Sequence, residues 1–97
     1  MSKKKGYKNE VIPVGDLELD GSTQARVGTD PQVVSEYSSV IEREGWVFPE
    51  IIVFRDKDGR NWVGDGFHRI AGGSGAGLPG IPSEVRPGGI KDALKYA

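Results

Sequence analysis

The sequence predicts a small α+β domain with a mixed sheet and packed helices, and two observations predict it. Short apolar runs of strand length alternate with segments of helical periodicity after a leading strand. In addition, a chain of 97 residues with 36% hydrophobic and 28% charged residues is typical of one globular domain rather than of a disordered chain.

The N-terminal half is predicted to form a strand followed by a helix. The strand at 11–19 runs into a turn, and Pro13 favours an edge strand or a strand start. Asp30 can cap the helix, Pro31 suits its first position, and Gly45 suits its C-terminal end. Apolar residues at helical spacing form one face of this helix: Val33, Val34, Tyr37, Val40 and Ile41.

A hairpin and a glycine-rich segment follow. The run Ile51–Phe54, a turn at 56–59 and a returning strand at 61–63 predict the hairpin. Residues 70–77 are expected to start a helix, although three interior glycines cost about 3 kcal/mol together. Either packing overrides that cost, or the segment is partly a loop. Residues 81–86 predict another strand, and 90–97 predict a helix without a C-terminal cap, which suggests a fragment of a longer protein.

Composition limits the partners and the compartment. No apolar run approaches the roughly 20 residues of a membrane helix, no secretory signal is visible, and the chain has no cysteine, which suits a cytoplasmic protein. Residues 1–10 are expected to be a flexible basic leader before a domain at 11–97, and its four lysines are Lys3, Lys4, Lys5 and Lys8. Without these lysines the formal charge falls from −1 to −5, so the domain at 11–97 is acidic. A phosphate site must therefore depend on a local group of donors or on the lysines of the leader.

The strongest local feature is the turn Gly64-Asp65-Gly66-Phe67-His68-Arg69. Its glycines allow a tight bend, and a helix start offers free N–H groups to an anion. Arg69 can grip phosphate with two hydrogen bonds, and His68 adds a side-chain donor. An anion or nucleotide-phosphate pocket is one interpretation. The other is a plain glycine turn in which Arg69 pairs with an acidic neighbour and His68 is an ordinary polar cap.

Further candidate residues lie close to this turn. Gln24 and Arg26 precede the first helix and are expected to close the pocket from the side. Asp65 is the candidate metal ligand, although one histidine and no cysteine make a poor cage. Together with bound phosphate, oxygen ligands can still hold Mg²⁺.

The order of these pieces resembles the ParB N-terminal domain, whose fold is shared with sulfiredoxin, over about 12–97. The matching segments are Ile12-Pro13-Val14-Gly15-Asp16-Leu17, Gln24-Ala25-Arg26, Pro49-Glu50-Ile51-Ile52-Val53, Asp58-Gly59, Gly66-Phe67-His68-Arg69 and Ile81-Pro82. More narrowly, the site turn with Glu84-Val85-Arg86-Pro87-Gly88 and Asp92-Ala93-Leu94 resembles ParB-like proteins of phages and mobile elements.

The resemblance implies a nucleotide- and DNA-associated domain, with CTP or ATP and Mg²⁺ as ligands and DNA as a partner. Phosphate contacts are expected from Gly66, Phe67, His68 and Arg69, with Gln24 and Arg26 beside them. Phe67 stands where sulfiredoxins have cysteine, which excludes sulfinic-acid reduction. It also replaces the ParB glutamate, which argues against magnesium-dependent hydrolysis of a nucleotide.

Two alternatives stay open. The first is a ParB-like nuclease or nucleotide hydrolase in which His68 is the general base and Asp65 binds metal. The second is an interaction module that keeps the fold without catalysis and acts on a host protein. A homodimer is a further expectation.

Overall fold

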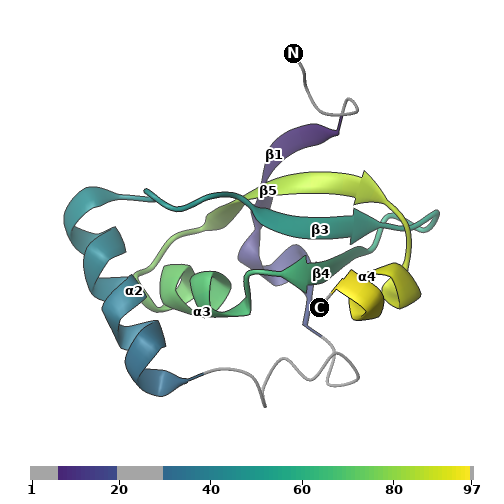
Figure 1. Cartoon of the computed structure of the whole chain (residues 1–97). Coiled ribbons are helices and arrows are strands. Elements are labelled where there is room, and N and C mark those ends of the chain that lie inside the picture. The colour runs from purple at the N-terminus through teal and green to yellow at the C-terminus, as the bar shows by residue number, and fades with distance from the viewer. Residues whose placement is uncertain (1–6, 20–29, 97) are drawn as a thin grey trace.

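One mixed sheet of five strands lies at the centre of the structure, a computed structural model that describes residues 7–19 and 30–96 (Figure 1). The strands are β1 (Lys8–Pro13), β2 (Leu17–Glu18), β3 (Ile51–Arg55), β4 (Asn61–Asp65) and β5 (Gly80–Pro87). The helices are α2 (Pro31–Glu44), α3 (Phe67–Gly75) and α4 (Ile90–Tyr96), and a 3-10 turn (Val14–Asp16) joins β1 to β2. In the described ranges, every helix is too short or too polar to span a membrane. The predicted α+β class is confirmed.

The strand order across the sheet is β1-β5-β3-β4-β2. Strand β5 is antiparallel to β1 and parallel to β3, whereas β4 is antiparallel to β3 and parallel to β2. The predicted hairpin is the β3–β4 pair, in which Phe54 lies opposite Trp62.

Strand β1 begins earlier than predicted. Lys8, Asn9 and Glu10 pair with β5, so the expected boundary between leader and domain at residue 10 is three residues too late. These residues are polar and give no local strand signal. Their strand conformation depends on hydrogen bonds to a partner more than 70 residues away in sequence.

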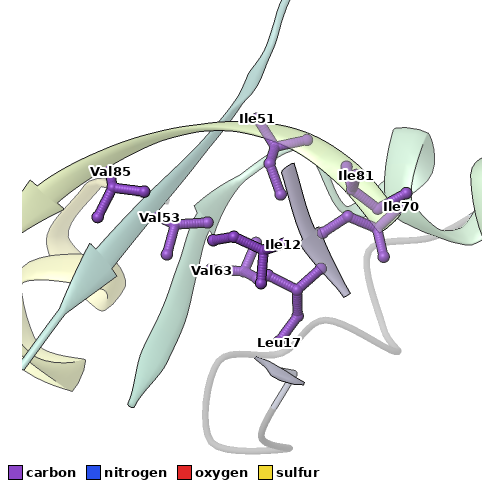
Figure 2. Close-up of a cluster of buried hydrophobic side chains, with 8 residues drawn as sticks. All are labelled: Ile12, Leu17, Ile51, Val53, Val63, Ile70, Ile81 and Val85. Carbon is purple, nitrogen blue, oxygen red and sulfur yellow. The ribbon is translucent and has the colours of Figure 1, made fainter. Parts of the chain in front are cut away.

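The two faces of the sheet bury two separate apolar clusters. The main cluster comprises Ile12, Leu17, Ile51, Val53, Val63, Ile70, Ile81 and Val85, of which Ile70 comes from α3 (Figure 2). Side chains alternate along a strand, so Phe54 and Trp62 point to the opposite face and pack against Ala93 of α4. Helix α3 and helix α4 therefore cover opposite faces of the β3–β4 hairpin.

The ends of α2 match the sequence prediction. The carboxylate of Asp30 accepts a hydrogen bond from Gln32 N–H at 2.9 Å, and Pro31 occupies the first position of the helix. Gly45 ends the helix with φ 82°, a conformation that glycine adopts readily.

The carboxylates of Asp56 and Glu10 accept hydrogen bonds from residues near the turn of the β3–β4 hairpin. Trp62 Nε1–H donates to Asp56 at 2.9 Å, and the backbone N–H groups of Arg60 and Asp58 donate to the same side chain, which lowers the pKa of Asp56 from its ordinary 3.8. Arg55 donates to Glu10 at 2.7 Å, and this hydrogen bond with its charge lowers the pKa of Glu10 from its ordinary 4.5.

We expect the free energy of unfolding to fall as the pH drops below about 5. Both carboxyls have a lower pKa in the folded chain, so their stabilisation is complete above the ordinary values of 4.5 and 3.8. It disappears as the pH falls through the folded-state values. Denaturant unfolding at about pH 7 and about pH 3 measures this loss.

Two asparagine variants assign part of the acid sensitivity to Asp56. The pH-dependent loss is expected to be smaller in Asp56→Asn than in the wild type, because the depressed carboxyl is gone. Asp58→Asn is the matched control, since the Asp58 carboxylate has no hydrogen-bond partner among the described residues. Equal losses in Asp56→Asn and the wild type contradict the prediction.

Helix α3 forms despite its glycines because α2 packs directly against them. A Cβ on Gly72 would lie 2.6 Å from Tyr37 Cβ, and one on Gly75 would lie 2.8 Å from Ser38 Oγ. Ser38 Oγ–H donates to Gly72 O at 2.8 Å across the contact. Close packing therefore offsets the low helix propensity, and the first of the two interpretations of this segment is confirmed.

Replacing Gly72 by alanine is expected to destabilise the domain by about 1–2 kcal/mol. A methyl group forced against the Cβ atom of a neighbouring side chain costs about 1–3 kcal/mol. The higher helix propensity of alanine offsets at most about 1 kcal/mol of this cost. The Cβ atom of Tyr37 cannot rotate away from the added methyl. The control is Gly15→Ala, where a Cβ meets nothing within 4 Å. Denaturant midpoints of the two variants test the prediction, and a stabilised Gly72→Ala contradicts it.

Candidate functional site

The predicted site turn joins β4 to α3. Asp65 ends the strand, Phe67 begins the helix, and Gly66 between them has φ 107° and ψ 25°. This is the left-handed region that favours glycine. A Cβ on Gly66 would also lie 2.5 Å from Ile51 Cγ2 and 3.3 Å from Arg69 Nη2. The sharp bend therefore requires a glycine at this position.

The start of α3 presents backbone amides. No side chain of residues 7–19 or 30–96 caps this helix end. Ile70 N–H donates to Gly66 O at 2.9 Å, whereas the amides of Phe67, His68 and Arg69 have no hydrogen-bond partner among the described residues. Unpaired N–H groups and the helix dipole favour an anion here.

Arg69 bridges the helix to the segment before β3. Its Nη1 donates to Pro49 O at 2.7 Å and to Glu50 O at 3.2 Å, and its Nη2 lies 3.3 Å from Asp65 Oδ2. Three of the five N–H groups of the guanidinium are thus engaged, and 16% of the side chain is exposed. Sequence analysis predicted either a phosphate contact or a carboxylate partner for this residue. It did not predict the two carbonyl partners.

His68 accepts a hydrogen bond rather than donating one at Nε2. The N–H of Asp30 donates to His68 Nε2 at 2.9 Å, which fixes the histidine proton on Nδ1. The imidazole also packs edge-on against Tyr37, with ring centroids 6.5 Å apart. In this arrangement Nε2 is not available as a general base, and His68 connects the start of α2 to the start of α3.

The remaining predicted residues have different positions. Phe67 is partly buried and packs against the main core cluster. Asp65 is exposed and shares its carboxylate with Arg69. Within 7–19 and 30–96, no group of three or more potential metal ligands gathers. Gln24 and Arg26 lie outside the described residues.

Two hollows adjoin the turn. The smaller hollow, of about 270 Å³, is lined by Tyr37, Asp65, Gly66, Phe67, His68 and Arg69. The larger hollow, of about 710 Å³, is lined by Tyr37, Phe48, Pro49, Glu50, Ile52, Asp65, Arg69, Glu84 and Tyr96. Tyr37, Asp65 and Arg69 belong to both linings, so the two hollows are neighbours.

Sequence analysis missed several residues of the larger hollow. The sequence predicts Tyr37 only as part of the apolar face of α2. Glu50 and Glu84 belong to segments that resemble the ParB domain, but the sequence gives them no predicted role in a site. Tyr96 comes from the last helix, far from the turn in sequence. The helical spacing of Tyr37 could not show that it stacks on Phe48, with ring centroids 4.8 Å apart.

Two residues that line the larger hollow, Glu84 and Tyr96, contact Arg86. Arg86 Nε donates to Glu84 at 2.7 Å, and its guanidinium lies over the rings of Tyr7 and Tyr96 at 4.7 and 5.2 Å. Partial burial alone lowers the pKa of Arg86, but the hydrogen bond and charge of Glu84 outweigh it, so this pKa is raised. The cation stays charged and neutralises Glu84.

The described part of the chain has an acidic balance. It contains nine of the thirteen Lys and Arg residues and thirteen of the fourteen Asp and Glu residues, for a formal charge of −4. The average field of this part of the chain therefore does not favour anions, and an anion site here would need the local amides and guanidinium.

Comparisons with known proteins identify the fold. The chain superposes on the C-terminally truncated chromosome-partitioning protein ParB from Caulobacter crescentus complexed with CTP-gamma-S, with a TM-score of 0.72, 22% identity and 91% of this chain covered. It spans about half (49%) of that ParB chain. A second structure of truncated ParB, complexed to the centromeric parS site, gives a TM-score of 0.64 and 22% identity over 80% of this chain and 39% of that one.

Sulfiredoxin from Arabidopsis thaliana gives a TM-score of 0.74 and 22% identity, covering 92% of this chain and 96% of that one. No protein-family model matches the sequence. No curated protein matches it either. The shared topology and the coverage of nearly all of this chain confirm the predicted fold: the domain has the ParB/sulfiredoxin-like fold.

Proposed function

We propose that the domain binds the phosphate group of a nucleotide or nucleic acid at the start of α3, in a DNA-associated role like that of ParB. The observation that supports this best is the left-handed Gly66 bend: the amides of Phe67, His68 and Arg69 have no partner among the described residues, and these residues line a hollow of about 270 Å³. A structure of the same fold is complexed with CTP-gamma-S, and another with parS DNA.

The proposal gives each residue of the turn a distinct role. The amides of Phe67, His68 and Arg69 bind phosphate oxygens, and Gly66 permits their close approach. Arg69 adds positive charge and two remaining N–H donors, but mainly positions the segment before β3. His68 positions the start of α2 through its bond with Asp30.

A nucleotide fits this site better than a dedicated metal cage does. Among the described residues, Asp65 is the one acidic residue that lines the smaller hollow, and Arg69 already contacts it. Mg²⁺ bound mainly by phosphate oxygens needs only one or two protein carboxylates. The DNA-associated role is assigned to the basic residues Lys3, Lys4 and Lys5 or to a further part of a longer protein, because the described body is acidic.

Thermal shift with inorganic tripolyphosphate and with nucleoside triphosphates, at low salt, tests the proposal. Ligand binding raises the midpoint of the wild type by mass action. His68→Gln is expected to keep this shift, because an amide oxygen can still accept the N–H of Asp30. His68→Glu also offers an acceptor but adds a negative charge beside the amides, so its affinity should fall by about tenfold or more. Absence of any shift for the wild type overturns the proposal.

A further inference from the structure

The larger hollow can accommodate the sugar and base of a nucleotide whose phosphate lies in the smaller hollow. Its volume, about 710 Å³, falls in the range of small-molecule pockets. Tyr37, Asp65 and Arg69 border both hollows. The sugar and base of a nucleotide anchored at the α3 amides would therefore lie next to Tyr37. This step rests on the proposed phosphate site.

Aromatic side chains give the larger hollow a surface suited to a flat ring. Tyr37 and Phe48 stack on each other with an interplanar angle of 29°, which holds both rings in fixed orientations. Tyr96 contributes a third aromatic side chain to the lining. Stacking on such rings stabilises any base and does not distinguish one base from another.

Selectivity comes from the hydrogen-bonding groups of the lining, which are mostly acceptors. Three acidic residues of the described chain line the larger hollow, and two of them are already paired, Asp65 with Arg69 and Glu84 with Arg86. The Glu50 carboxylate has no hydrogen-bond or ion-pair partner among the described residues. The backbone of Glu50 is nevertheless held in place, because its carbonyl accepts from Arg69 Nη1. The Glu50 side chain therefore extends from a fixed backbone position, and its two carboxylate oxygens are free to accept hydrogen bonds from a ligand.

We infer that the larger hollow selects a guanine base, which Glu50 binds through the N1–H and the 2-amino group. These two donors are adjacent and parallel, so both oxygens of one carboxylate accept from them in charge-assisted bonds. Adenine and cytosine place their amino group beside a ring nitrogen whose lone pair faces the carboxylate. Uracil offers a single N3–H between two carbonyls. Of these bases, only guanine donates a hydrogen bond to each of the two carboxylate oxygens.

The negative charge of Glu50 does not exclude a nucleotide. The arginines Arg69 and Arg86 neutralise the other two carboxylates of the lining. Both the phosphates and Glu50 border open hollows, so salt and solvent screen their repulsion.

Calorimetric titration of the full chain with GTP, ATP, CTP, UTP and tripolyphosphate, with Mg²⁺ present, tests the inference. The wild type is expected to bind GTP about tenfold more tightly than the other three nucleotides. Glu50→Gln should lose this preference and retain its affinity for tripolyphosphate. Glu42→Gln, an exposed position on α2 outside both hollows, should behave as the wild type.

The outcomes separate the two proposals. Equal affinity for the four nucleotides, or a preference for CTP, with tripolyphosphate still bound, overturns the guanine assignment and leaves the phosphate site intact. A GTP preference that persists in Glu50→Gln also overturns the assignment to Glu50. No binding of any nucleotide or of tripolyphosphate overturns the proposed function and this inference together.

Discussion

Replacing Gly66 by alanine is expected to destabilise the domain by about 2–4 kcal/mol, the largest effect of any single substitution at the site. Two costs combine. A residue with a Cβ pays about 1–2 kcal/mol to adopt the left-handed φ of 107°. The new methyl would also lie 2.5 Å from Cγ2 and 2.9 Å from Cβ of Ile51, which is 0% exposed and has no space to move into.

A second glycine isolates the steric part of this effect. Gly59 in the hairpin turn has φ 85°, but a Cβ there meets nothing within 4 Å. Gly59→Ala should therefore lose only about 1–2 kcal/mol from backbone strain. Denaturant unfolding of both variants gives the comparison. Equal losses of stability in the two variants mean that Ile51 moves aside, and that its packing against residue 66 is not rigid.

The sequence predicted those parts of the fold that depend on short-range signals. Asp30, Pro31 and Gly45 delimit α2 through caps that involve neighbouring residues, and the apolar run of β3 needs no partner to be recognised. The early start of β1 could not be predicted in this way, because Lys8 and Glu10 become strand residues only through β5. The fit of Gly72 against Tyr37 likewise depends on how two helices approach each other.

The bend between a strand and a helix at the candidate site was predicted from the sequence, but its internal contacts were not predictable. Arg69 reaches carbonyl groups 19 and 20 residues away, and His68 accepts from an amide 38 residues away. Residue types show that arginine can bind phosphate, but they do not show which local acceptors compete for it. Likeness to phage and mobile-element proteins, cytoplasmic location, a homodimer and a host partner stay predictions.

Arg69→Lys should separate the charge of Arg69 from its bridging geometry. Lysine keeps the positive charge, but its single nitrogen cannot reproduce the three contacts with Pro49 O, Glu50 O and Asp65. We expect a loss of about 1–3 kcal/mol in the free energy of unfolding, because the partly buried carbonyl of Glu50 and the exposed carbonyl of Pro49 lose their donor. The exposed contact with Asp65 contributes little of this, about 0.3–0.5 kcal/mol.

The binding of ligands should change in a selective way. Without the bridge, the segment that holds Glu50 loses its fixed position, so Arg69→Lys should lose the preference for GTP while still binding tripolyphosphate. Arg69→Ala should weaken both, since it removes the charge as well. Arg43→Ala is the control, because its side chain is 63% exposed and its ion-pair distance to Glu44 is 3.7 Å. If Arg69→Lys equals the wild type in stability and in nucleotide preference, the guanidinium acts only as a charge, and the segment at 49–50 is held by other contacts.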